Sequence, residues 1–522
     1  MQEYLLLYNF FGYPNQGTKR VLLRCLTETP SCYPVKWRVL SPNHDLVGEG
    51  EWKREPRSYG VESWSADFSF VTFSDLYTFH VDFSNGQSMA SEPFDVSRSP
   101  YLNQLGLRLS IHAAKARYAR GTRDGGFYDC NSRMGESHSH GVYLNGLCWF
   151  DFLHRSHLTP MEKAELRWAE QETFDYLMKL YNEETGEFRD YTEDRPYDPR
   201  NYGIFNTIDA LYGLSAYMSL IGSEDPDRCH TASLERLKKS YEFASSHEEK
   251  PEALIQYTNS EWLPSIACHL YRFSGEATYL TEARDWLLHK LPEIDLRDLP
   301  RGYWCSINLF EGMALVKALA PKTADDPRWT ACLDRAKSRI AELMERSAYQ
   351  FPPPVDRDHS AQAWDHMEEL PSASLDNVWN TRWFGNNDVS LWGIQACWLA
   401  MLTDDASFAN SAAAAINFIC GLNFGLPGDM VNPPSEAPLA AASFFIRLPH
   451  TVKPWKNWYF RQGEGNWTSI VNGYTVRDGK AFYTDEDFIT GETYIMTDGL
   501  FLYLITLYER MLHGEDILAS IR

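Results

Sequence analysis

The fold is indicated by a stretch that occurs twice in degenerate form, as Phe273-Ser-Gly-Glu-Ala-Thr-Tyr-Leu-Thr-Glu-Ala-Arg284 and as Leu402-Thr-Asp-Asp-Ala-Ser-Phe-Ala-Asn-Ser-Ala412. In each copy, the end of an apolar helix is followed by an acidic turn and by the aromatic-led start of a new helix. A repeat of this kind predicts antiparallel helical hairpins, which pack as an (α/α)6 barrel or as a superhelical solenoid.

Helical periodicity extends from this repeat in both directions, beginning at Leu102 and continuing to the C-terminus. A barrel gathers its inter-helix loops at one end, and three long Gly/Pro-rich, aromatic segments could supply that end: residues 120–141, 351–387 and 421–491. About a dozen helices are expected, the first starting at Leu102 and the others covering residues 142–154, 160–181, 205–220, 233–245, 262–273, 281–291, 307–318, 329–343, 389–402, 408–420 and 494–511.

The first 97 residues have a different pattern. Short β-rich runs such as Arg20-Val-Leu-Leu-Arg24 and Leu76-Tyr-Thr-Phe-His-Val-Asp-Phe83 are separated by turns such as Ser84-Asn-Gly-Gln87. Strands at this spacing are typical of a small immunoglobulin-like sandwich. We therefore predict a multidomain protein with an all-β sandwich over residues 1–97 and an all-α (α/α)6 barrel over residues 98–522.

The composition narrows the possible partners. The chain has 522 residues, and its 49 Lys+Arg against 71 Asp+Glu give a formal charge of −22, which disfavours nucleic acids and anionic membranes. No run reaches the roughly 18 apolar residues of a membrane span. The 17 Trp, 29 Tyr and 28 Phe residues suit stacking on neutral sugars as well as core packing.

The cysteines and the N-terminus predict a cellular compartment. The ten cysteines are scattered without a C-x-x-C motif, which favours thiols of a reducing compartment over a disulfide framework. The start, Met1-Gln-Glu-Tyr-Leu-Leu-Leu-Tyr8, lacks the basic and apolar segments of a signal peptide. A cytoplasmic protein is expected, or a secreted one if a leader was removed.

Several motifs resemble those of glycoside hydrolase family 9 and occur in the same order. Tyr8-Asn-Phe-Phe-Gly-Tyr-Pro-Asn15 and Asp67-Phe-Ser-Phe-Val71 resemble the immunoglobulin-like domain that precedes many of its catalytic domains. Asp124-Gly-Gly-Phe-Tyr-Asp129 resembles the D-G-G-[WY]-x-D-A-G-D signature, and Cys420-Gly-Leu-Asn-Phe-Gly425 resembles the L-G-x-N-P-x-G segment. Tyr483-Thr-Asp-Glu-Asp-Phe-Ile-Thr-Gly-Glu492 resembles the terminal Y-x-D-x-x-x-x-Y-x-x-N-E motif.

The resemblance implies an inverting β-glycosidase that needs no cofactor. The terminal Glu of the family is the general acid and corresponds to Glu492, while the D-A-G-D aspartates hold and deprotonate the attacking water, and Asp129 matches the first of them. An inverting mechanism uses a carboxylic acid and a carboxylate about 6.5–9.5 Å apart. The acid needs a raised pKa, which neighbouring carboxylates such as Asp485 and Asp487 could supply.

The chain departs from the signature directly after Asp129, where Cys130-Asn131-Ser132 replaces A-G-D. Ser132 occupies the usual position of the base, and its hydroxyl cannot accept a proton at neutral pH. Three explanations stay open. Asp129 acts alone, a group of the following polar run replaces the missing carboxylate, or hydrolysis is lost and the groove only binds sugar. The candidate substitutes are Glu136, His138 and His140, because carboxylates and histidines are capable bases.

The two histidines also have a simpler interpretation, since they could hydrogen-bond a polar loop. They could bind a metal as well, but no third ligand has a suitable spacing, so no metal site is predicted.

Interleaved aromatic and polar residues before a predicted helix suit sugar hydroxyls beneath a stacked ring. Trp379-Asn-Thr-Arg-Trp-Phe-Gly-Asn-Asn-Asp388 has this pattern, although core packing would explain any single Trp equally well. Arg447-Leu-Pro-His450 is the nearest counterpart of the family's H-H-R sugar-binding element. The expected substrate-binding residues are Tyr128, Asn131, Ser132, Trp379, Arg382, Trp383, Arg447, His450, Asp485 and Asp487.

We therefore expect a glycosidase that acts on a short oligosaccharide or glycoconjugate, because a cytoplasmic enzyme would not meet crystalline polysaccharide. One alternative is a catalytically silent carbohydrate-binding protein on the same scaffold. Another is a non-hydrolytic sugar-modifying enzyme that uses a loop histidine as base. The sequence leaves the sugar, the linkage and the oligomeric state open.

Overall fold

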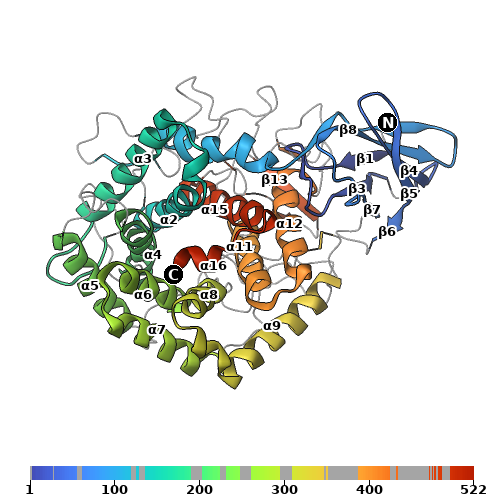
Figure 1. Cartoon of the computed structure of the whole chain (residues 1–522). Coiled ribbons are helices and arrows are strands. Elements are labelled where there is room, and N and C mark those ends of the chain that lie inside the picture. The colour runs from blue at the N-terminus through green and yellow to red at the C-terminus, as the bar shows by residue number, and fades with distance from the viewer. Residues whose placement is uncertain are drawn as a thin grey trace.

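The computed structural model describes residues 3–27, 29–55, 62–118, 125–128, 136–189, 203–223, 231–246, 260–293, 308–345, 349–350, 386–423, 431–432, 470, 473, 475–477, 480–484 and 494–522. Figure 1 shows a ring of helices beside a β-sheet domain, which confirms an all-β domain followed by an all-α barrel. The ring closes because α15 (Ile495–Leu512) packs against α2 (Ser137–His154). This closure favours the barrel over the solenoid.

The N-terminal domain consists of two sheets packed face to face. One has the strand order β1–β3–β7–β6, and the other has the order β2–β10–β8–β4–β5 with β9 beside β8. Alternate residues of β8 point into the core, where Tyr77, Phe79 and Val81 are buried. The strands are β1 (Tyr4–Leu7), β2 (Tyr13–Pro14), β3 (Arg20–Cys25), β4 (Pro34–Leu40), β5 (Leu46–Glu51), β6 (Lys53–Arg54), β7 (Ser63–Asp67), β8 (Asp75–Phe83), β9 (Ser88–Ala90) and β10 (Phe94–Ser97).

Within the described residues, six helices form the inner wall of the ring (Figure 1). They are buried on almost every side, so apolar residues lie all round each helix and the few charged ones, such as Glu311 and Asp498, are buried as well. The inner helices are α2, α4 (Gly203–Ala216), α6 (Leu263–Ser274), α8 (Leu309–Leu319), α11 (Asn386–Thr403) and α15. None of the helices in the described part of the chain has the length and apolar character to span a membrane.

The outer layer is amphipathic. In α5, for example, Leu237, Tyr241 and Ala244 are buried at spacings of four and three residues, so one stripe faces the inner wall. The outer elements are the continuous run η1 (Leu102–Gly106), η2 (Arg108–His112) and α1 (Ala113–Arg117), then α3 (Pro160–Lys179), α5 (Thr231–Ser246), α7 (Ala277–Lys290), α9 (Pro327–Glu345) and α12 (Ala406–Cys420). Shorter elements are η3 (Arg155–His157), η4 (Tyr217–Gly222), η6 (Ser260–Trp262), η9 (Pro321–Asp325) and α16 (Ile517–Ile521).

Both copies of the sequence repeat form the same turn from an inner to an outer helix. At the end of α6, Gly275 has a φ of 73°, and at the end of α11, Asp404 has a φ of 55°. An acidic residue then leads into the next helix in both copies, and Asp405 accepts a hydrogen bond from the backbone of Ser407. The repeat therefore encodes a left-handed helix end followed by an acidic helix start.

Three inner helices lie unusually close together. A Cβ atom on Gly146 of α2 would lie 2.2 Å from the carbonyl oxygen of Gly499 in α15. A Cβ atom on Gly141 of α2 would lie 2.0 Å from the carbonyl oxygen of Asp209 in α4. Because both obstacles are backbone atoms, glycine is required, and the N-terminal ends of α15, α2 and α4 are brought side by side.

Two expectations about loops were wrong. Residues 137–141, expected in a polar loop, form the first turn of α2. They gave no helical signal because an inner helix is enclosed on all sides and has no polar-to-apolar periodicity. The expected loop 421–491 contains a small sheet of β11 (Val431–Asn432), β12 (Thr475–Arg477) and β13 (Lys480–Thr484), in the order β11–β13–β12.

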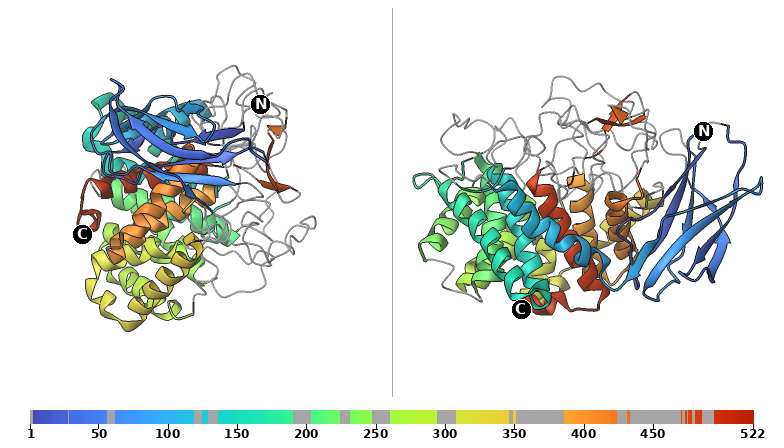
Figure 2. Two further views of the ribbon diagram at one scale, coloured as in Figure 1. Left: turned by 90° about the vertical axis from the view of Figure 1, so that its right-hand side faces the viewer. Right: turned by 90° about the horizontal axis from the view of Figure 1, so that it is seen from above.

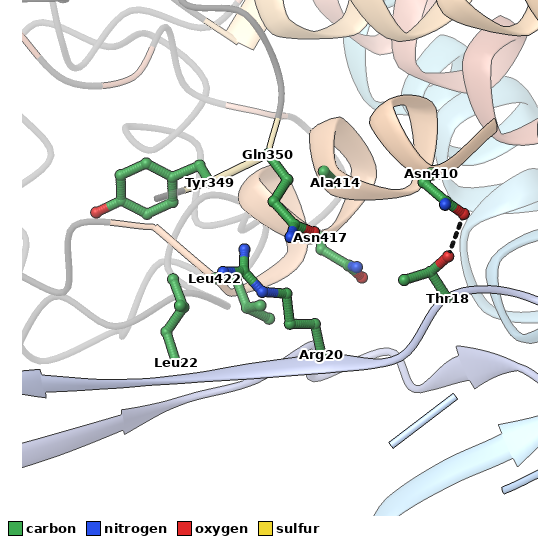
Figure 3. A pocket seen from close by; sticks show the side chains of 9 residues that line it. All are labelled: Thr18, Arg20, Leu22, Tyr349, Gln350, Asn410, Ala414, Asn417 and Leu422. Atoms are coloured by element: carbon green, nitrogen blue, oxygen red, sulfur yellow. Dashed lines mark hydrogen bonds between the residues drawn. The ribbon is translucent and has the colours of Figure 1, made fainter. Parts of the chain in front are cut away.

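The two domains meet at a buried polar cluster of Asn9, Tyr101 and Asn417, here called the joint. Asn9 is fully buried, and its amide nitrogen donates to Asn417 Oδ1 at 2.8 Å and to Tyr101 Oη at 3.0 Å. A small pocket lies beside this joint, where Thr18 bonds Asn410 (Figure 3). It is lined by Thr18, Arg20 and Leu22 of the sandwich and by Tyr349, Gln350, Asn410, Ala414, Asn417 and Leu422 of the barrel.

Replacing Asn9 by alanine is expected to lower the free energy of unfolding by about 1–3 kcal/mol, because the buried acceptor of Asn417 loses a donor. Urea denaturation followed by circular dichroism measures this change. Asn43→Ala, at an exposed turn of the same domain, should stay within about 0.5 kcal/mol of the wild type. Equal stability of the Asn9 and Asn43 variants would show that the joint contributes nothing to the free energy of unfolding.

Candidate active site

The inner helices begin at the same end of the ring, because α2, α4, α6, α8 and α11 are each followed by an outer helix that returns the chain. The last inner helix, α15, runs parallel to α2, since Gly146 faces Gly499 and Trp149 stacks on Tyr503. The turns at the opposite end are short, and only two residues link α6 to α7 and α11 to α12. The C-terminus also lies at that opposite end (Figure 2). The connections into the inner helices are long: α9 ends at Glu345 and α11 begins at Asn386. Long connections on a rigid scaffold are where functional residues gather.

The segment 125–128, Gly-Gly-Phe-Tyr, leads toward α2 and is fixed against α3. Gly125 and Gly126 have φ values of 71° and 80°, a region that glycine adopts without steric cost. The backbone N–H of Gly126 donates to Glu172 Oε1 at 3.0 Å. A Cβ atom on Gly126 would lie 2.6 Å from the ring of Tyr176, so the close approach also requires glycine.

His140 fixes this segment through its contacts with Phe127. The backbone N–H of Phe127 donates to His140 Nε2 at 3.1 Å, and the two rings stack with centroids 6.0 Å apart. The other ring nitrogen, Nδ1, lies 3.2 Å from the carbonyl oxygen of Glu136. Burial lowers the pKa of His140 to about 3, so the ring is neutral at physiological pH. Nε2 therefore accepts and Nδ1 donates.

Arg117 joins the segment 125–128 to the first turn of α15. Its Nη1 donates to the carbonyl oxygen of Tyr128 at 3.2 Å, and its own carbonyl oxygen accepts from the Tyr128 N–H at 2.7 Å. Its Nη2 lies 3.2 Å from Asp498 Oδ2, and neither side chain has exposed surface. Tyr128 directly precedes Asp129, and Asp498 follows Glu492 by six residues. The Arg117 side chain thus fixes Tyr128 against the first turn of α15.

Glu136 and His138 form a second pair at the start of α2. Glu136 Oε2 lies 3.1 Å from His138 Nε2, and the side chains are 17% and 3% exposed. Burial lowers the pKa of His138, against the opposite influence of the Glu136 charge and of the Asn206 side chain. His138 is therefore neutral at physiological pH, and its Nε2 lies against the carboxylate. The ring also packs against Phe205 of α4.

Comparisons with known proteins identify the architecture. No protein-family model matches the sequence, and no curated protein does. A metagenome-derived glycoside hydrolase family 9 endoglucanase superposes with a TM-score of 0.67 at 13% identity, over 97% of this chain and 99% of its own. The chain has the fold of family 9 endoglucanases.

Two further structures agree over the same length. A family 9 glycoside hydrolase of Bacteroides ovatus has a TM-score of 0.63 at 13% identity, over 97% of this chain and 99% of its own. AaCel9A, solved in complex with a cellobiose-like isofagomine, has a TM-score of 0.65 at 14% identity, again over 97% and 99%. The family 9 fold thus extends through both domains.

Four of the residues expected in the site are described, and all four lie at the end where the inner helices begin: Tyr128, Glu136, His138 and His140. The others lie outside the described residues, and their roles stay predictions: Asp129, Asn131, Ser132, Trp379, Arg382, Trp383, Arg447, His450, Asp485, Asp487 and Glu492. No group of three or more His, Cys, Asp or Glu in the described part of the chain could hold a metal ion.

Sequence reasoning missed Arg117 and Asp498, because an ion pair between residues so far apart leaves no local pattern. It also missed a polar cluster in the centre of the barrel. There Glu311 Oε2 accepts from Tyr212 Oη at 2.5 Å and from Asn308 Nδ2 at 2.9 Å. Burial raises the pKa of Glu311 to about 7, although both hydrogen bonds favour the ionised form.

Proposed function

We propose that this protein is a glycosidase that cleaves a glycosidic bond of a short oligosaccharide or glycoconjugate with inversion at the anomeric carbon. The observation that carries the proposal is the Arg117 bridge. It ties the segment that ends at Tyr128 to the first turn of α15. In the sequence, Asp129 directly follows Tyr128 and Glu492 precedes Asp498 by six residues, so the contact ties together the chain segments that lead to the proposed water-holding aspartate and the proposed general acid.

In the proposed reaction, Glu492 protonates the oxygen of the leaving group while water attacks the anomeric carbon from the opposite face. The bond between the anomeric carbon and the leaving oxygen breaks, and the water loses a proton to a carboxylate. Asp129 holds this water. The aromatic and polar residues around Trp379 and Trp383 would stack on the sugar and bond its hydroxyls.

The substrate is inferred from the chain's chemistry. The net charge of −22 disfavours strongly anionic sugars, and the aromatic residues suit neutral ones. A short oligosaccharide follows from the predicted cytoplasmic location. The full-length likeness to endoglucanases makes β-linked gluco-oligosaccharides the first substrates to test.

The test is a turnover screen of the wild type beside Glu492→Gln on short β- and α-linked gluco-, xylo- and amino-oligosaccharides. Loss of the general acid is expected to lower kcat by about 10²–10⁴-fold, since the leaving oxygen must then depart unprotonated. Mass spectrometry detects the products, and NMR should show the inverted anomer first. Glu165→Gln, on the outer helix α3, is the matched control and should keep wild-type turnover.

A silent carbohydrate-binding protein is the second candidate, and the serine at position 132 favours it. Sugar binding without turnover in both the wild type and Glu492→Gln would select this alternative and reject the glycosidase.

A further inference from the structure

The proposed reaction lacks a group that accepts the proton of the attacking water. The proposal that follows rests on that reaction. An inverting glycosidase needs a carboxylate that takes the proton of the attacking water. Ser132 stands where the related signature has this carboxylate. A replacement must lie at the same end of the barrel, on a fixed element, close to the chain that carries Glu492.

The axial register of α2 and α15 places Glu136 beside the chain that leads into α15. The two helices run parallel, because Gly146 faces Gly499 and, farther along both, Trp149 stacks on Tyr503 with ring centroids 5.3 Å apart. These contacts fix the axial position of one helix against the other.

The same register can be followed to the helix starts. Gly499 contacts the backbone of Val142 and Tyr143. Ile495, four residues and thus about 6 Å earlier on the helix axis, lies level with the first turn of α2. The chain therefore enters α15 beside the start of α2, and Glu136 is the last residue before α2. Glu492 precedes Ile495 by three residues.

The surroundings of Glu136 suit a catalytic base. One carboxylate oxygen lies 3.1 Å from Nε2 of the neutral, buried His138, whose ring limits the orientations open to the carboxylate, and the Glu136 side chain is 17% exposed. Glu136 also stands at the N-terminus of the 18-residue helix α2, whose dipole stabilises a negative charge there.

The other two candidate bases are committed to different contacts. Both ring nitrogens of His140 contact backbone atoms, of Phe127 and of Glu136. His138 is 3% exposed, and its Nε2 faces the Glu136 carboxylate. Glu136 is therefore the group of the three with exposed surface and proton-accepting oxygens.

We propose that Glu136 is the catalytic base and that His138 is a positioning residue for it. Asp129 holds the water, and Glu136 takes its proton as the water oxygen bonds to the anomeric carbon. The glycosidic bond breaks in the same step, and the leaving oxygen receives its proton from Glu492.

The test compares Glu136→Gln with the wild type on the oligosaccharide of the panel that the wild type cleaves, with and without sodium azide. Glu136→Gln should lower kcat by about 10²–10⁴-fold and change KM little. Azide needs no deprotonation, so it should restore turnover and yield a glycosyl azide of inverted configuration. Because rescue requires a folded site, it also excludes misfolding as the cause of the loss.

Two further variants separate catalysis from structure. Glu136→Asp retains a carboxylate and should lose less activity than Glu136→Gln. His138→Gln should lower kcat with KM preserved and should also respond to azide, which a purely structural defect would not. Glu165→Gln serves again as the control.

The outcomes distinguish a failure of the base assignment from a failure of the glycosidase proposal. If the wild type cleaves and Glu492→Gln does not, but Glu136→Gln retains more than a third of kcat or is not rescued by azide, the base assignment is wrong and the glycosidase stands. If the wild type cleaves no member of the panel, both proposals are rejected.

Discussion

Replacing Arg117 by methionine should destabilise the protein by about 3–5 kcal/mol, because the buried Asp498 carboxylate would lose the guanidinium that lies 3.2 Å from it. Asp498 Oδ1 accepts from the backbone N–H of Ile470 at 3.0 Å, so its carboxylate cannot turn away without breaking a second contact. The loss should appear in urea denaturation as a lower midpoint. Activity should fall as well, since the carbonyl group of Tyr128 loses its donor and Asp129 loses its anchor.

The double variant Arg117→Met/Asp498→Asn is the control for this ion pair. It removes both charges and keeps the acceptor for Ile470, so it should be more stable than Arg117→Met alone. Arg117→Lys retains the charge but has no planar fork to reach Tyr128 and Asp498 together. An Arg117→Met protein within about 1 kcal/mol of the wild type would contradict a structural role for the pair.

Glu311→Gln should stabilise the protein at alkaline pH. Burial raises the pKa of Glu311 from its ordinary value of 4.5 to about 7. Between these pH values the folded state holds more protons than the unfolded chain, so the free energy of unfolding falls as pH rises. Above about pH 7 the full cost of the buried charge is present, on the order of 3 kcal/mol. Glutamine keeps an acceptor for Tyr212 and Asn308 and carries no charge.

The measurement is the free energy of unfolding of both proteins from pH 4 to pH 9. The stability of Glu311→Gln relative to the wild type should rise between about pH 4.5 and 7 and stay constant above. Glu184→Gln, at an exposed turn, should show no such difference. A difference that does not depend on pH would mean that Glu311 does not titrate in this range.

Much of the fold could be predicted from local signals. The acidic turn and the aromatic-led start predict a helix over residues 408–420, and the structure has it as α12 (Ala406–Cys420), with Asp405 as its N-cap. Alternation in β8 separates its buried residues from its exposed ones, as expected of a sandwich strand. The first turn of α2 could not be predicted, because His138 and His140 are polar residues buried by neighbours distant in sequence.

The candidate site was predictable only in part. The sequence alone determined the order of the domains, the paired helices of the barrel and the motifs around Asp129 and Glu492, because periodicity, helix ends and motif spacing depend on residues close together in the chain. Only the tertiary structure decided that Arg117 joins the motif segments, that both nitrogens of His140 are occupied, and that Glu136 faces His138. Burial, hydrogen bonding and charge pairing are set by side chains from different helices, so they exist only once the ring has closed.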